Sequence, residues 1–266
     1  MVSKSHHWSL TTQIGGNLIA LLTNDDGVEA RGLKALKKEI SKIARVWVVA
    51  PDREQSGTSH SLTLSRPLRL NKVEEKVYSI DGTPTDAVMI AFHKVLRRKP
   101  DILISGINSG PNLGDDVTYS GTVAAAIEGT ILGIPSMAVS LTDSTFEKFE
   151  YGAKFIRKLA DYVLKKGLPA DTFLNVNIPP YKSAEGGLNK FKITRLGKRV
   201  YKDVIVEKID PRGKKYFWIA GQAIVSEGGK DSDFSAIEKG YISITPLHLD
   251  WTNYKTIEEM KGWRIF

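Results

Sequence analysis

Two kinds of apolar pattern alternate along the first 180 residues of the chain. Short, continuous apolar runs bounded by turn-forming residues predict strands that are buried on both faces; they span residues 17–23, 45–51, 101–107 and 135–141, with a shorter strand at 173–180. Between these runs, apolar residues recur with the spacing of a helix. This spacing predicts helices over residues 30–44, 83–96, 120–133 and 149–167.

The stretch before the second helix has a different pattern. Residues 60–70 and 76–80 predict a pair of strands at the edge of a sheet, where Pro67 is tolerated. The helix that follows has a defined start. Thr83 is expected to cap it, Pro84 suits its first position, and Asp86 places an acid in its first turn.

The order strand, helix, strand predicts βαβ units, which have parallel strands and a right-handed crossover. We therefore expect an α/β fold, with a Rossmann-like, doubly wound and mostly parallel sheet over residues 17–180. After Pro180, aromatic and charged residues alternate, which predicts β-hairpins. Residues 181–266 are expected to form a β-hairpin-rich C-terminal extension with a short helical tail, which folds back on the core or reaches a partner subunit. Residues 1–16 are polar and predict a flexible N-terminal extension.

Composition narrows the class of protein. The chain has 266 residues, of which 41% are hydrophobic and 26% charged, which is typical of a globular protein. No apolar run is long enough to span a membrane, and the N-terminus lacks the apolar core of a secretory signal, so no membrane partner is expected. Cysteine is absent, which excludes disulfides, thiolate catalysis and cysteine-bound zinc. We expect a cytoplasmic location.

The net charge of +8 has two interpretations. It reflects either a solvated lysine and arginine surface or attraction to anions such as phosphorylated metabolites or nucleic acid. The basic residues are scattered, and the sequence contains neither zinc-finger spacing nor an RNA-recognition aromatic motif. We therefore do not expect nucleic acid to be a partner.

An adjacent acidic pair, Asp25 and Asp26, follows the first predicted strand and precedes Gly27. Two neighbouring carboxylates repel one another, so keeping both ionised requires a cation. Ligands of open parallel sheets bind at the carboxyl ends of the strands, where Ser56 and Asn108 are also expected. This oxygen-only set suits Mg²⁺, Mn²⁺ or Ca²⁺. The alternative is ordinary turn chemistry, with an aspartate capping the next helix.

A second candidate site begins with a glycine- and asparagine-rich loop that contains Asn112. The loop leads into the helix start Ser120-Gly121-Thr122. The free N–H groups and partial positive charge of a helix start favour phosphate. The alternative is a simple hydroxyl cap followed by tight alanine packing. Asp115 and Asp116 are interpreted as solvated or as structuring the loop. A P-loop is excluded, because GxxxxGK[ST] is absent.

A divalent cation beside an anion-binding helix start predicts hydrolysis of a phosphate monoester. Either Asp25 or Asp26 would orient or deprotonate the attacking water, or attack directly. Asn112 and the helix N–H groups would hold the phosphoryl oxygens that gain charge.

Several segments of the chain resemble, in order, the motif blocks of the SurE (survival protein E) family of 5'-nucleotidases: "TNDDG", "APDREQSG", "GTPTDAV", "SGINSGPNLGDDVTYSGTVAAAIEG" and "GYISITPLH". The resemblance covers about residues 17–250. It implies a metal-dependent phosphatase acting on nucleoside 5'-monophosphates. It also implies a Rossmann-like core in a homodimer or homotetramer whose C-terminal segments are exchanged between subunits.

Carried over position by position, the resemblance implies one divalent cation per subunit, Mg²⁺ or Mn²⁺, with Ca²⁺ also able to occupy the site. The implied metal ligands are Asp25, Asp26, Ser56 and Asn108. The implied phosphate-binding residues are Asn112, Ser120, Gly121 and Thr122, and the implied catalytic residues are Asp25, Asp26 and Asn112. His248 is expected near the mouth of the site or at a subunit contact.

Two other functions are compared with this sequence pattern. A phosphatase of the haloacid dehalogenase type needs two aspartates separated by one residue, whereas Asp25 and Asp26 are adjacent. A non-catalytic protein that binds nucleotides or nucleic acid remains an alternative because of the positive charge.

Overall fold

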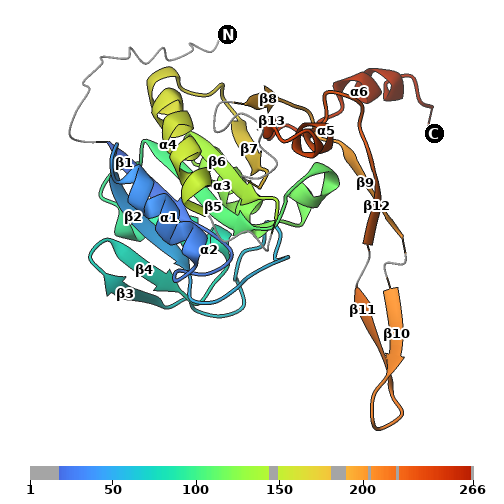
Figure 1. Cartoon of the computed structure of the whole chain (residues 1–266), viewed down its shortest axis with the longest axis horizontal. Coiled ribbons are helices and arrows are strands. Elements are labelled where there is room, and N and C mark those ends of the chain that lie inside the picture. The colour runs from blue at the N-terminus through green and yellow to red at the C-terminus, as the bar shows by residue number, and fades with distance from the viewer. Residues whose placement is uncertain (1–17, 144–148, 181–189, 203–204, 220–221, 265–266) are drawn as a thin grey trace.

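The structure is a computed structural model that describes residues 18–143, 149–180, 190–202, 205–219 and 222–264. The predicted N-terminal extension, residues 1–16, lies outside these described residues. A nine-stranded sheet forms the centre of the molecule, with strand order β3-β4-β2-β1-β5-β6-β7-β13-β8 (Figure 1). In that order, the strands are β3 Leu70–Glu74, β4 Val77–Ile80, β2 Arg45–Pro51, β1 Ile19–Thr23, β5 Ile102–Ser109, β6 Ser136–Leu141, β7 Thr172–Ile178, β13 Ile242–His248 and β8 Phe191–Ile193.

The pairing within this sheet is mostly parallel. The run from β4 through β2, β1, β5 and β6 to β7 is parallel throughout, and β3 and β13 pair in the antiparallel direction with β4 and β7. Residues on β1 alternate between the two faces, as expected for a strand. Ala20 and Leu22 enter one apolar core, and Ile19 and Leu21 enter the other. The predicted Rossmann-like, doubly wound fold is confirmed.

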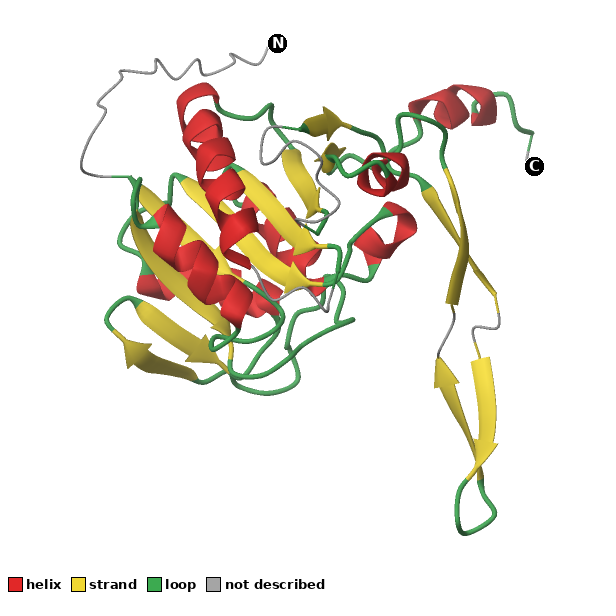
Figure 2. Ribbon diagram, in the orientation of Figure 1, coloured by secondary structure: helices red, strands yellow, loops and turns green. Residues whose placement is uncertain are grey.

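Helices cover both faces of the sheet (Figure 2). One face is covered by α1 and α4, which pack against each other, and the other face is covered by α2 and α3. The bounds of these helices are α1 Arg31–Ile40, α2 Pro84–Ile90, α3 Gly121–Ile131 and α4 Phe149–Lys166. The capping predicted for α2 is also confirmed, because Thr83 and Asp86 form a reciprocal capping box with Pro84 at the first position. A π-helical turn, Ala91–Val95, continues this helix.

The strand predicted over residues 60–70 is wrong. This segment is a loop, and the edge strand β3 begins only at Leu70. Two backbone groups near its start bond to side chains of the α2 cap. The Thr63 N–H donates to Asp86 Oδ1 at 3.0 Å, and the Ser61 carbonyl accepts from Thr83 Oγ1 at 2.8 Å. The residues that cap α2 therefore bind the segment in which the strand was predicted.

The C-terminal part divides between the core and an extension. β8 and β13 join the central sheet, whereas the other C-terminal strands form two separate two-stranded sheets that project from the body (Figure 1). These hairpin strands are β9 Lys198–Lys202, β10 Ile205–Ile209, β11 Lys215–Ile219 and β12 Gln222–Glu227. The predicted hairpins and helical tail are confirmed, the tail being α6 Tyr254–Met260, while the short helix α5 Asp233–Glu238 was not expected.

No helix within the part of the chain that the structure describes has the length and apolar character needed to cross a membrane.

Candidate cation and phosphate site

The carboxyl ends of β1, β2 and β5 form one edge of the sheet, because β1 pairs in parallel with both neighbours. The turn after β1 is tight. Asn24 Nδ2 donates to the Gly27 carbonyl at 2.9 Å, and Gly27 has φ +101°, which favours glycine. The Asp25 carbonyl accepts from the Gln55 N–H at 2.7 Å, and Asp26 Oδ2 accepts from the Ser109 N–H at 3.3 Å. These bonds bring the acidic pair beside the segments that carry Ser56 and Asn108.

Asp25 lies against the start of α3. Its side chain is buried, and both carboxylate oxygens bind Thr122: Oδ2 accepts from the backbone N–H at 3.1 Å, and Oδ1 accepts from the hydroxyl. A Cβ at Gly121 would stand 3.0 Å from the Asp25 Cβ, so glycine is needed for this approach. Burial raises the pKa of Asp25, and the hydrogen bonds from Thr122 oppose that rise. The helix start thus holds a carboxylate of the chain itself.

Asp26 is half-buried and has fewer partners. Burial, followed by the charge of Asp25, raises the pKa of Asp26 to about 6. The charge of Glu54, which the sequence analysis did not single out, acts in the same direction on both aspartates. Among the residues that the structure describes, no lysine, arginine or histidine forms an ion pair with either aspartate. Within the described part of the chain, therefore, no basic side chain supplies the compensating cation that ionisation of both acids requires.

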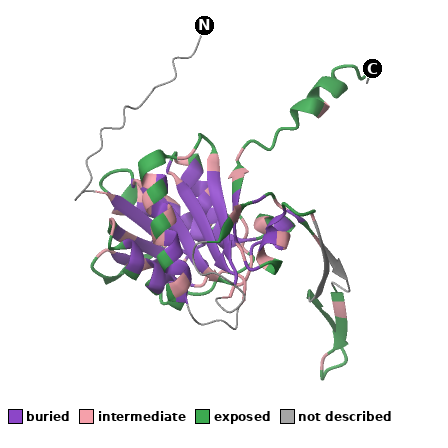
Figure 3. Cartoon of the chain, turned by 45° about the horizontal axis from the view of Figure 1, so that its top comes forward, coloured by how far each residue is buried: buried purple, intermediate pink, exposed green. Residues whose placement is uncertain are grey.

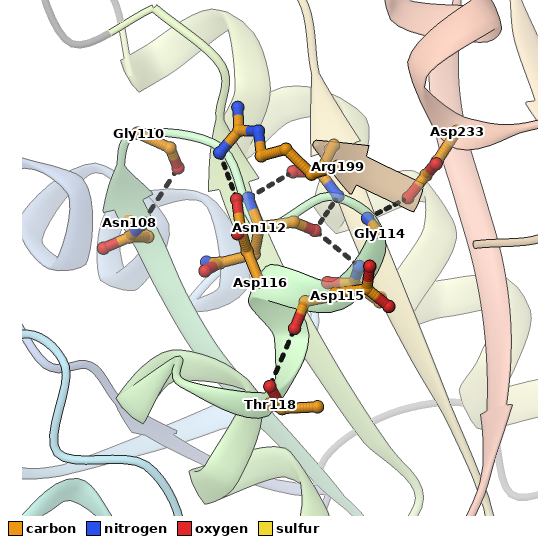
Figure 4. Close-up of polar contacts among 11 residues, drawn as sticks. Asn108, Gly110, Asn112, Gly114, Asp115, Asp116, Thr118, Arg199 and Asp233 are labelled. Atoms are coloured by element: carbon orange, nitrogen blue, oxygen red, sulfur yellow. Dashed lines mark hydrogen bonds and ion pairs between the residues drawn. The ribbon is translucent and has the colours of Figure 1, made fainter. Parts of the chain in front are cut away.

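The predicted ligand set fits a hard divalent cation. Ser56 is exposed and donates to Glu54 Oε1 at 2.8 Å. Asn108 donates through Nδ2 to the Gly110 carbonyl at 2.9 Å, which leaves its amide oxygen available on the half-buried edge (Figure 4). No group of three or more His, Cys, Asp or Glu residues that could hold a metal occurs within the described ranges. An oxygen-only site built on two carboxylates is consistent with that result and with Mg²⁺, Mn²⁺ or Ca²⁺.

Asn112 is fixed by hydrogen bonds from two neighbouring strands. Its N–H donates to Asn177 Oδ1 at 2.9 Å, and its carbonyl accepts from Asn175 Nδ2 at 2.8 Å and Asn177 Nδ2 at 2.9 Å. Its side-chain Nδ2 donates to Ser140 Oγ at 2.7 Å. All these residues are buried. The loop that carries Asn112 is therefore held rigidly against β6 and β7.

The C-terminal segment holds the next part of the same loop (Figure 4). Asp233 accepts from the Gly114 N–H and the Gly197 N–H, both at 2.8 Å. Asp116 forms a largely buried ion pair with Arg199. The loop-structuring role considered for Asp116 is confirmed, whereas Asp115 is exposed.

The remaining predicted residues lie at the start of α3 and at the end of β13. Ser120 caps α3, and its hydroxyl accepts from the Val123 N–H at 3.2 Å. Both donors of Thr122 bind Asp25, so that Thr122 positions an acid of the site. His248 lies at the end of β13 and lines a cavity beside α3. The structure thus brings Asp25, Asp26, Ser56 and Asn108 to one edge, with the start of α3 next to them.

Sequence reasoning missed the residues that support the site: Glu54, Ser140, Asn175, Asn177, Arg199 and Asp233. One signal was present in the chain. The two asparagines of β7 stand two positions apart in the otherwise apolar segment "FLNVNI", so they share one face of a buried strand. Buried amides need hydrogen-bond partners, which predicts a polar network on that face.

The fold and this edge define a class of protein. The chain is a Rossmann-like α/β protein whose oxygen-only acidic site lies at the carboxyl ends of parallel strands, beside a helix start. Comparison with known proteins is consistent with this class. The family model described as "Survival protein SurE" matches residues 20–203, and the chain belongs to the SurE family.

Relatives of this chain match over nearly its whole length. A protein of Geotalea daltonii named "5'-nucleotidase SurE" is 51% identical over 247 residues, covering 92% of this chain and 99% of its own length. A protein of the same name from Caldanaerobacter subterraneus subsp. tengcongensis is 46% identical over 256 residues, covering 94% and 99%. The crystal structure of the SurE protein from Aquifex aeolicus matches with a TM-score of 0.81 and 46% identity, covering 91% of this chain and 98% of that one.

Proposed function

We propose that this chain is a metal-dependent phosphatase that hydrolyses nucleoside 5'-monophosphates to nucleoside and phosphate. One observation carries the proposal. Two adjacent, poorly solvated carboxylates, Asp25 and Asp26, lie at the carboxyl edge of the sheet with no protein cation beside them among the described residues. The relatives named 5'-nucleotidase support the reaction and the class of substrate.

Asp25, Asp26, Ser56 and Asn108 would hold the cation. When bound, a divalent cation supplies Lewis acidity toward a phosphoryl oxygen and lowers the pKa of a coordinated water. The oxygen ligands favour Mg²⁺ or Mn²⁺, and Ca²⁺ fits the same set.

The two aspartates would have different tasks. Both oxygens of the buried Asp25 bind Thr122, so this carboxylate is fixed and suited to holding charge. Asp26 is more accessible, and within the described residues its carboxylate accepts a hydrogen bond from the Ser109 N–H at 3.3 Å. We assign to Asp26 the orientation of the attacking water. Asn112, held by β6 and β7, and the start of α3 at Ser120 and Gly121 would bind the phosphate. Thr122 belongs to the same helix start, but its N–H and hydroxyl both bind Asp25, so it would hold that acid beside the phosphate.

We also propose that the chain forms a homodimer or homotetramer through the C-terminal part. Large apolar residues on the projecting hairpin are exposed in the single chain: Ile205, Ile209, Tyr216, Phe217, Trp218 and Ile219. The tail helix α6 also exposes Tyr254, Ile257 and Met260. Exposed apolar patches of this kind are typical of protein–protein contacts. The cytoplasmic location and the division at residue 180 stay predictions.

The test is phosphate release from adenosine 5'-monophosphate by purified protein with Mg²⁺ or Mn²⁺, with and without a chelator. We expect turnover that the chelator abolishes and that added metal restores. A protein that binds the nucleotide without turnover would support the alternative of a non-catalytic nucleotide-binding protein. Turnover that the chelator does not reduce would contradict the cation's role.

A further inference from the structure

A cavity of about 330 Å³ lies along α3, between that helix and the C-terminal return of the chain. Val123, Ala124 and Ile127 of α3 line one wall. Phe173 of β7 and Leu247 of β13 line another. Its volume is at the lower end of the ~300–1,000 Å³ range of pockets that bind small molecules. Its lining is mostly apolar, which favours a flat aromatic ligand.

The cavity lies next to the start of α3, which contacts Asp25 of the acidic pair. Ser120 lines it, and the next residue, Gly121, is the position at which a Cβ would stand 3.0 Å from the Asp25 Cβ. Ser59 also lines the cavity, and the preceding residue, Thr58, places its hydroxyl 3.1 Å from the same Cβ position. A ligand whose phosphate lies at the acidic edge therefore has an apolar space directly beside it.

We propose that this cavity binds the base of the nucleoside 5'-monophosphate, an inference that rests on the proposed function. The phosphate end needs the charged edge, and the base needs an apolar surface that covers its faces. Trp251 lines the cavity and is 78% exposed, so its ring is free to stack on a base. Polar groups of Ser59, Thr118 and His248 also line the cavity, where they can bind the base edge.

One polar contact joins two parts of the wall. His60, which lines the cavity, has its Nε2 2.9 Å from Oε2 of the buried Glu128 on α3. The loop that carries Ser59 and His60 is thereby fixed to the helix. The base site would be built from both the N-terminal core and the C-terminal segment, which gives the C-terminal segment a direct part in substrate choice.

The experiment compares adenosine 5'-monophosphate with ribose 5-phosphate, a monoester that has no base. Two variants alter the cavity: Trp251→Ala removes the stacking ring, and Ile127→Phe fills the space. Each has a matched control outside the cavity. Trp263→Ala changes another exposed tryptophan of the tail, and Ile131→Phe changes an exposed residue one turn further along α3.

We expect Trp251→Ala and Ile127→Phe to raise KM for adenosine 5'-monophosphate about tenfold, with kcat changed less than twofold. KM for ribose 5-phosphate should stay within twofold, and both controls should behave as the unaltered chain. Equal losses on the two substrates, or no loss on either, would overturn the base site. Circular dichroism checks that Ile127→Phe is folded.

A second measurement keeps the base site separate from the phosphatase activity. Equilibrium dialysis of adenosine, without metal, should show binding to the unaltered chain and to Ile131→Phe, and at least tenfold weaker binding to Ile127→Phe. This result would support the cavity even if no turnover were found, in which case only the proposed reaction would fail. Adenosine that does not bind the unaltered chain, or binds Ile127→Phe equally well, would contradict the base site.

Discussion

The carboxyl edge of the sheet and the projecting C-terminal hairpin differ in which side chains they bury and which they expose. At the edge, polar groups such as Asn112, Asn177 and Asp233 are buried and hydrogen-bonded within one chain. On β11, the apolar side chains of Phe217 and Trp218 are exposed. The outer part of the projecting hairpin is coloured mostly as exposed in Figure 3. Under the proposed function, the edge would bind a cation that balances its acids, and the exposed apolar face of the hairpin would pack against a partner chain. The two regions therefore suit different partners, an ion in one case and a protein in the other.

The largest effect is expected at the acidic pair. On the proposed mechanism, Asp26→Asn would remove both a cation ligand and the group that orients the water, so kcat should fall at least ~10³-fold. The unfolding temperature without metal should not fall, because a repulsive charge is removed. Phosphate release and thermal unfolding measure the two outcomes. Asp115→Asn, an exposed acid of the nearby loop, should keep its rate within twofold. A folded Asp26→Asn with the original rate would refute the role of Asp26.

The next effect is expected in the asparagine network that holds the loop. Asn177→Ala leaves the buried Asn112 N–H without its partner and removes one donor from the Asn112 carbonyl. The free energy of unfolding should fall by about 2–4 kcal/mol. Denaturant titration measures it, and kcat should also fall because Asn112 is less well placed. Asn71→Ala, in the exposed edge strand β3, is the control and should change stability by less than about 0.5 kcal/mol. A similar change in both variants would contradict the network.

A smaller effect is expected in the pH dependence of the metal-free chain. The pKa of Asp26 rises from 3.8 to about 6 on folding, so between these values the folded chain binds the proton that the unfolded chain has lost. Stability should therefore fall as pH increases from about 4 to 6, and the destabilisation should be complete above 6. Asp26→Asn should flatten this part of the profile. Unfolding curves at several pH values in chelator would check this. A profile that Asp26→Asn leaves unchanged would show that other groups cause the slope.

The smallest effect on turnover is expected at the hairpin. Trp218→Glu places a charge on the exposed apolar face of β11 and should lower the mass of the assembly in light scattering. Because β11, which carries Trp218, lies on the hairpin that projects away from the central sheet, turnover should stay within about threefold (Figure 1). Lys214→Ala, at the turn of the same hairpin, should leave the mass unchanged. An unaltered mass in Trp218→Glu would remove the hairpin from the proposed interface.

The regular strands and helices could be predicted because their residue patterns match the burial and the capping that the folded chain gives them. The β2 bounds, Arg45–Pro51, match the predicted run, since a strand buried on both faces must be apolar along its whole length. The start of α2 was predicted because Thr83, Pro84 and Asp86 act within one turn. The strand expected over residues 60–70 failed because the bonds that fix this loop come from Thr83 and Asp86, which local pattern does not reveal.

The chain by itself determined the order of strands and helices, the resemblance to the SurE family and the acidic pair, because these depend on neighbours in sequence. Only the tertiary structure showed that Asp25 binds Thr122, 97 positions away, or that Asp233 holds Gly114, 119 positions away. Burial and long-range hydrogen bonds follow from how the elements pack, and packing is a property of the whole molecule. The same holds for the cavity along α3, whose walls come from segments that meet only when the C-terminal strand returns to the sheet.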